Sequence, residues 1–285
     1  LVSRIKNQGL KDFQPRIITS AIEHESVLET CRDLEKQGVE VIYLPVNKQG
    51  VVDLKKLKES LSDQTVLLSI MYANNEIGTV QPIGEIAEII SNFRKVSGFK
   101  FRDSSNLIYP LFHVDAVQAL QFLDCDVNNL GVDLMTLSAH KVYGPKGVGV
   151  LYVREQRARG KERILGSDFI APIITGGGQE YGLRSGTENV PLIVGMAEAV
   201  DLVLKEKERS FLKISELRHH LWSGIRSIYR KAEINGVPIN GRWQGARSKQ
   251  NTLPNILNVY FPGFLAEELL VMFDINGVAV SAGSA

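Results

Sequence analysis

The chain has 285 residues, of which 44% are hydrophobic and 23% are charged, and its formal net charge is +1. This composition allows a large core and gives no electrostatic reason to expect a nucleic acid or a membrane as partner. No apolar stretch reaches the roughly 18 residues that span a bilayer, and no signal-peptide pattern occurs. Its two cysteines, Cys31 and Cys125, exclude a disulfide framework and lack metal-ligand spacing. We expect a soluble, cytoplasmic protein without a metal.

Strand-like and helix-like runs alternate along the first half of the chain, a pattern typical of a mostly parallel sheet with helices on its faces. Helices are predicted over residues 26–37, 53–61 and 82–96, and a polar surface insertion over residues 97–110. The predicted strands cover residues 16–19, 39–44, 65–70, 112–114, 133–137 and 147–153. These elements predict one large α/β domain over residues 1–189.

Polar residues follow three of these strands. One strand leads into Asn75 beside a glycine turn, one ends at Asp115, and one delivers Lys141 onto a glycine-rich turn. Ligands collect outside the carboxyl ends of parallel strands, so the three ends predict one shared site. A lysine on a rigid element suits Schiff-base chemistry, and burial can lower its pKa. An aspartate suits the pyridinium nitrogen of pyridoxal 5'-phosphate (PLP), although each residue alone could be an ordinary surface or turn residue.

A different pattern begins after Asn189. Residues 190–232 predict one long connecting helix with a charged, solvated middle. Residues 233–285 predict a small C-terminal α/β domain. Its elements are a strand over residues 256–261, a helix over residues 267–273 and a strand over residues 278–281.

Five motifs occur in the order typical of the cysteine desulfurase family, PLP enzymes of the aminotransferase class V group. They are Glu23–Leu28, Asn74–Gly78, His113–Asp115, Ser138–Lys141 and Gly176–Thr187. The chain resembles this family over nearly its whole length, and selenocysteine lyase is a close relative within the group. The resemblance implies the PLP-dependent transferase fold of type I. It also implies removal of sulfur from L-cysteine, giving L-alanine and an enzyme persulfide for iron-sulfur cluster or thio-cofactor synthesis.

The resemblance implies three central roles. Lys141 would form the Schiff base with PLP and move the proton at the substrate's α-carbon. Asp115 would keep the pyridine nitrogen protonated. His24, at the head of a predicted helix, would stack on the cofactor ring and could serve in proton transfer. A capping or packed histidine is the alternative for His24.

Five further residues are implied to bind the cofactor. Asn75 and Gln118 would donate hydrogen bonds to its phenolic oxygen, and Ser138 and His140 would bind its phosphate. Thr187 would reach the phosphate held by a neighbouring subunit, which implies a homodimer. The other implied partners are L-cysteine and a sulfur-acceptor protein, either a scaffold or a sulfur carrier.

The resemblance places a phosphate-binding stretch before Leu1 and the family's catalytic cysteine after Ala285. We therefore expect this chain to be an inactive fragment of a desulfurase, because neither Cys31 nor Cys125 is placed to accept sulfur. Selenocysteine lyase, another class V PLP enzyme and a non-catalytic fragment remain alternatives. An organellar targeting segment before Leu1 also remains open.

Overall fold

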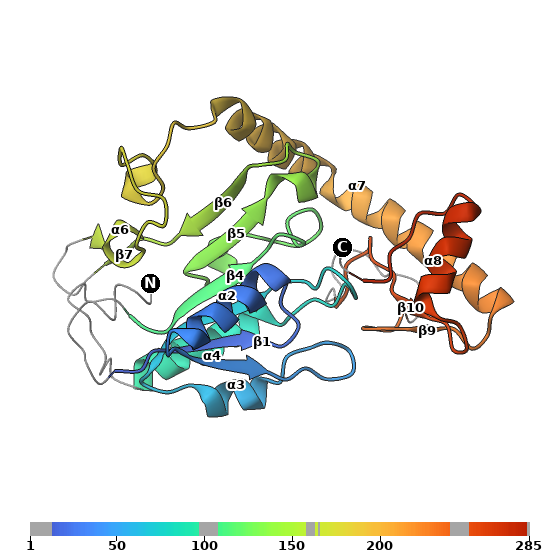
Figure 1. Cartoon of the computed structure of the whole chain (residues 1–285), viewed down its shortest axis with the longest axis horizontal. Coiled ribbons are helices and arrows are strands. Elements are labelled where there is room, and N and C mark those ends of the chain that lie inside the picture. Colours follow the sequence, from blue (N-terminus) through green and yellow to red (C-terminus); the bar gives the residue numbers. More distant parts are fainter. Residues whose placement is uncertain (1–12, 97–107, 158–162, 165, 240–250, 284–285) are drawn as a thin grey trace.

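The computed structural model describes residues 13–96, 108–157, 163–164, 166–239 and 251–283. Its centre is a six-stranded sheet with the strand order β2-β1-β3-β4-β5-β6 (Figure 1). All neighbouring strands pair in parallel except β6, which runs antiparallel to β5. The strands are β1 (Arg16–Ser20), β2 (Glu40–Leu44), β3 (Thr65–Met71), β4 (Leu111–Asp115), β5 (Leu134–Ser138) and β6 (Gly149–Val153). The predicted α/β class and all six predicted strands are confirmed.

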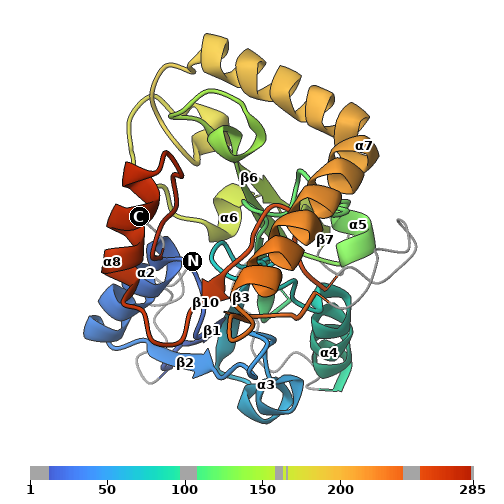
Figure 2. The same ribbon diagram turned by 90° about the vertical axis from the view of Figure 1, so that its right-hand side faces the viewer.

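Helices cover both faces of the sheet because successive strand residues point to opposite sides. On one face, Ile17 and Leu111 pack with Cys31 of α2 (Glu25–Lys36) and with Phe169 of α6 (Gly166–Phe169). The other face packs against α3, α4 and α5, and Figure 2 shows α2 and α4 on opposite sides of the sheet. These three helices are α3 (Leu54–Ser60), α4 (Ile83–Val96) and α5 (Val127–Leu130). Most of the predicted surface insertion, residues 97–107, lies outside the described residues.

The long predicted helix is present as α7 (Val190–Ile228), whose 39 residues cross the molecule to the C-terminal elements (Figure 1). Near its middle, the Phe211 ring meets the Phe122 ring edge-on, with the ring centroids 6.2 Å apart. The small elements are β7 (Gln156–Arg157), β8 (Arg163–Ile164), β9 (Glu233–Ile234), β10 (Val259–Tyr260) and α8 (Ala266–Ile275). The chain also contains the 3-10 helices η1 (Ala139–Val142) and η2 (Glu180–Gly182).

Of two C-terminal predictions, one is wrong in part and the other is wrong. The strand predicted over residues 256–261 is reduced to β10, which pairs with the two residues of β9 alone. Residues 278–281 form no strand. A strand requires a neighbour with which to form its hydrogen-bonded ladder, and apolar alternation alone does not supply one.

The start of α3 depends on Asp53. Its Oδ1 accepts hydrogen bonds from the amides of Lys55 (2.9 Å) and Lys56 (3.1 Å), two groups that the helix leaves unpaired. We expect Asp53→Ala to lower the free energy of unfolding by about 1 kcal/mol. Urea denaturation measures this change, with the exposed Lys48→Ala as control. Equal losses in the two variants would contradict the capping role.

Candidate functional site

The candidate residues follow the carboxyl ends of neighbouring strands. After β1 the chain continues into β2 on one side of β1, whereas β3 lies on its other side. This reversal is a topological switch point, the place where open α/β sheets bind ligands. Met71, the last residue of β3, is level with Asp115, and Asp115 is level with Thr136 of β5. The ends of β3, β4 and β5 therefore meet at one edge of the sheet, as predicted.

Lys141 lies on η1, immediately after β5. The buried Ala139 and Val142 anchor this short helix, and Tyr143 caps it in a left-handed conformation with φ of 63°. The next strand approaches β5 so closely that a Cβ at Gly149 would lie 2.7 Å from the Leu137 carbonyl oxygen. The buried residues within η1 and the close packing of β6 on β5 thus hold η1 in place. Lys141 itself is exposed.

Asp115 is a half-buried acid at the end of β4. Its Oδ1 accepts a hydrogen bond from the Val117 amide, 3.0 Å away. Burial raises the pKa of this carboxyl group, while the Val117 amide, the charge of His24 and the Thr136 hydroxyl act in the opposite direction. The Met71 amide, which lies in register with Asp115, donates to the Glu23 carboxyl group at 2.8 Å, so the loop that carries His24 lies beside the ends of β3 and β4.

His24 is the N-cap of α2, as its predicted position at a helix head required. Its Nδ1 accepts from the Ser26 amide at 3.2 Å and lies 2.8 Å from the Ser26 Oγ. Both interactions use the same ring nitrogen and direct it toward the helix. The exposed ring is therefore held at one edge, and its other nitrogen has no hydrogen bond to any described residue.

The remaining candidates form two pairs and one separate residue. Ser138 and His140 lie beside Lys141, with the Ser138 Oγ and the His140 Nδ1 2.8 Å apart. Asn75 and Gln118 are half-buried in the turns that follow β3 and β4. Thr187 is exposed between η2 and α7, and within the described ranges no hydrogen bond joins it to the other candidates. One chain thus brings seven of the eight candidate residues to the same edge.

Two buried residues beside the candidates did not emerge as candidates from the sequence. Glu23 precedes His24, and Asn74 precedes Asn75; their side chains are 5% and 6% exposed. The Asn74 Nδ2 donates to the Ile22 carbonyl at 3.0 Å, which joins the turn after β3 to the loop after β1. Both residues belong to motifs quoted above, so adjacency within a motif was the available signal.

A second titratable group, the half-buried His113, lies on the same strand as Asp115. His113 is two residues before Asp115 on the same face of β4, and its Nδ1 lies 2.8 Å from the Ser69 Oγ. Burial lowers the pKa of His113 from 6.5 to about 4. Burial raises the pKa of Glu23 from 4.5 to about 7 despite hydrogen bonds from Ser20 and Met71.

These two shifts predict opposite effects of pH on stability. Between pH 4.5 and about 7, Glu23 keeps its proton in the folded chain but loses it in the unfolded chain. Its contribution to the free energy of unfolding therefore falls as the pH rises through this range. Between pH 6.5 and about 4, His113 is protonated in the unfolded chain but neutral in the folded chain. Its contribution to the free energy of unfolding therefore falls as the pH drops through this range. In Glu23→Gln only the second slope remains. We expect the free energy of unfolding of this variant to rise from pH 4.5 to 6.5 more than wild type by roughly 2 kcal/mol.

Urea denaturation at a series of pH values measures this difference. His113→Asn should have the opposite effect and leave the falling slope of Glu23. Parallel curves for wild type and Glu23→Gln would contradict the burial of a neutral carboxyl group at this position.

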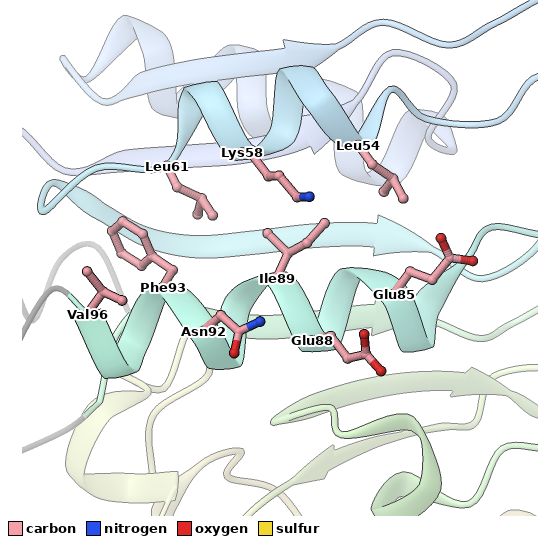
Figure 3. A pocket seen from close by; sticks show the side chains of 9 residues that line it. All are labelled: Leu54, Lys58, Leu61, Glu85, Glu88, Ile89, Asn92, Phe93 and Val96. Atoms are coloured by element: carbon pink, nitrogen blue, oxygen red, sulfur yellow. The ribbon is translucent and has the colours of Figure 1, made fainter.

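The cysteines and the cavity between α3 and α4 contribute no candidate residue. Burial raises the pKa of the Cys31 thiol to about 11 and that of Cys125 to about 12, so neither is a thiolate at neutral pH. A cavity of about 430 Å³ lies between α3 and α4 (Figure 3). It is lined by residues such as Leu54, Ile89 and Phe93 and by none of the candidate residues. Among the described residues, no group of acidic, histidine or cysteine side chains could hold a metal ion, and no helix could cross a membrane.

Comparison with known proteins gives consistent similarities. The family model described as Aminotransferase class-V matches residues 4–285. Cysteine desulfurase IscS of Proteus mirabilis (strain HI4320) is 44% identical over 282 residues, which are 98% of this chain and 60% of that protein. Cysteine desulfurase IscS of Dictyoglomus turgidum (strain DSM 6724 / Z-1310) is 42% identical over 269 residues, 94% of this chain and 59% of that protein. The chain spans about 60% of the length of these curated relatives.

Solved structures show the same similarity. A NifS-like protein superposes with a TM-score of 0.78 and 36% identity, over 98% of this chain and 66% of the other. SspA in complex with cysteine superposes with a TM-score of 0.69 and 33% identity, over 99% of this chain and 68% of the other. The described sheet and its flanking helices therefore have the fold of NifS-like proteins.

Proposed function

The chain belongs to the class-V aminotransferase family, a family of PLP-dependent enzymes, and on that basis we propose that it is the PLP-binding part of a cysteine desulfurase. In the proposed reaction L-cysteine and a thiol give L-alanine and a persulfide on that thiol. The observation that carries the proposal is the meeting of Lys141, Asp115 and His24 at one edge of the sheet. The similarity to SspA, whose structure contains cysteine, supports the choice of substrate.

The residues at this edge suit PLP chemically. Lys141 presents its amine on an anchored element and forms no ion pair within the described part of the chain. Asp115 offers a half-buried carboxyl group, and Ser138 and His140 offer hydrogen-bonding groups beside the lysine. When bound, PLP accepts the electron density that develops as a bond to the substrate's α-carbon is broken.

Each side chain then has a defined task. Lys141 holds the cofactor and transfers the proton at the substrate's α-carbon, and Asp115 retains a proton on the pyridine nitrogen. His24, fixed through its Nδ1, provides a flat surface for the ring. The amides of Asn75 and Gln118 donate to the phenolic oxygen. Ser138 and His140, with Thr187 of a second copy, bind the phosphate.

The role of Thr187 requires a homodimer. Large apolar side chains are exposed directly after η1, on β6 and on the segment before α7; Tyr143, Ile173 and Tyr181 are 80%, 98% and 88% exposed. Apolar surface of this kind is typical of subunit interfaces. Light scattering should give twice the 31.6 kDa mass of one chain. The mass of a single chain would exclude Thr187 from the site.

Sulfur transfer needs a thiolate that this chain does not provide. The thiol pKa values of Cys31 and Cys125, about 11 and about 12, keep both residues protonated at neutral pH. A sulfur-acceptor protein is the proposed partner of the whole enzyme, and the cytoplasm its proposed location. We expect this chain to perform proton transfer at the α-carbon without releasing sulfur.

The test follows L-alanine in D₂O by proton NMR in the presence of PLP. The chain should exchange the α-proton of L-alanine, the proposed product, without forming pyruvate. With L-cysteine and dithiothreitol it should release no more sulfide than PLP alone. Pyruvate formation would instead support a transaminase. Absence of exchange by a folded chain would contradict the proposal and favour a non-catalytic fragment.

A further inference from the structure

Glu23 connects two elements of the site without belonging to it. It lies in the loop between β1 and α2, directly before His24. Its Oε1 accepts hydrogen bonds from the Ser20 Oγ at 2.5 Å and from the Met71 amide at 2.8 Å. One carboxyl oxygen therefore joins the end of β1 and the end of β3 to the residue that precedes His24.

The same connection reaches Asp115 through the backbone. Met71 pairs in register with Asp115, and the Tyr72 amide donates to the Asp115 carbonyl oxygen at 2.8 Å. The hydrogen bond from the Asn74 side chain to the Ile22 carbonyl is a second connection between this loop and the turn after β3. Glu23 thus fixes the distance between the loop of His24 and the strand that bears Asp115.

A contribution to folding stability does not explain why an acidic residue occupies this position. The Glu23 side chain is 5% exposed, and its Oε2 has no hydrogen-bond partner among the described residues. A buried polar atom without a partner costs free energy, so such an atom requires a specific explanation. The charged and titratable groups around it are Asp115 from β4, Cys31 from α2 and the neighbouring His24.

We propose that Glu23 is a positioning residue, whose carboxyl group holds His24 in place relative to Asp115 so that the imidazole can lie on the PLP ring. The role rests on the proposed function, since it presumes PLP between these residues. A neutral group suffices because the two hydrogen bonds at Oε1 need only an acceptor. A second negative charge would also repel the carboxylate of Asp115.

The test compares Glu23→Gln and Glu23→Ala with Glu25→Ala as control. Glutamine keeps the acceptor oxygen and the length of the side chain, whereas alanine removes both. Glu25 is an exposed acid in the first turn of α2. We expect Glu23→Ala to weaken PLP binding about tenfold or more, the effect of losing about one to two hydrogen bonds. Glu23→Gln and Glu25→Ala should bind PLP as wild type does.

A spectroscopic measurement separates positioning from general destabilisation. Circular dichroism of the bound cofactor reports the environment of its ring, and it should fall per bound PLP in Glu23→Ala but not in Glu23→Gln. Equal signals in all variants, or equal loss in the glutamine and alanine variants, would overturn the proposal.

Hydrogen exchange without PLP makes the result independent of the proposed function. In Glu23→Ala the Met71 amide should exchange at least about tenfold faster than in wild type. In Glu23→Gln it should exchange as slowly as in wild type. The His24 ring resonances should shift in the alanine variant alone. If wild type binds no PLP while these signals behave as expected, the proposed function fails and the connection through Glu23 stands. Unchanged Met71 exchange would overturn the connection itself.

Discussion

Lys141→Ala is expected to abolish α-proton exchange of L-alanine in the presence of PLP. The amine at this position is the only group assigned both to holding the cofactor and to moving the proton. Removing a positioned acid or base lowers a rate by about 10²–10⁴-fold, and losing the attachment adds to that loss. The exchange rate should therefore fall to the rate of PLP free in solution, as measured by proton NMR.

Lys146→Ala is the matched control for this experiment. Lys146 is an exposed lysine in the glycine-rich turn that follows η1. It has the same charge and a similar exposure but does not follow directly on a strand end. We expect its exchange rate to equal that of wild type. If both variants lost exchange equally, the lysines would act through the charge of the turn, and the role of Lys141 would be wrong.

Asp115→Asn is expected to lower the exchange rate far more than it lowers the affinity for PLP. Asparagine keeps the size of the side chain and an oxygen that can accept from the Val117 amide, but it carries no negative charge. Loss of one preorganised electrostatic partner lowers a rate by about 10²–10³-fold. The dissociation constant, measured by titration of the cofactor's absorbance, should change by less than about tenfold, because the other contacts to PLP remain.

Asp124→Asn provides the comparison for Asp115. Asp124 is exposed and accepts hydrogen bonds from the Asp126 amide at 2.9 Å and from the Asn129 side chain at 3.1 Å. It lies outside the candidate site, so both affinity and exchange should stay at the wild-type level. A large loss of affinity with an unchanged rate in Asp115→Asn would contradict its assigned role.

The sheet and the strand-end residues were predictable from the sequence because both follow from local patterns. Apolar runs bounded by turns specified all six strands of the sheet, and motif order placed Asp115 and Lys141 at strand ends. Exposure was less predictable: Lys141 follows a partly buried strand yet is itself exposed, because η1 turns the chain after Ser138.

Interactions between distant segments were not predictable. The hydrogen bond from the Met71 amide to the Glu23 carboxyl group joins residues 48 positions apart, and no local pattern in either segment indicates it. The missing strand at residues 278–281 has the same cause, since pairing depends on a partner elsewhere in the chain. The role of Thr187 depends on a second subunit and stays a prediction.

Binding of PLP through Lys141 underlies every role proposed for this chain. The most direct measurement is reduction of the PLP-treated chain with borohydride, followed by digestion and mass spectrometry of the peptides. We expect one cofactor, fixed on the peptide that contains Lys141 and absent from Lys141→Ala. Labelling spread over exposed lysines such as Lys146, and unchanged in Lys141→Ala, would contradict it.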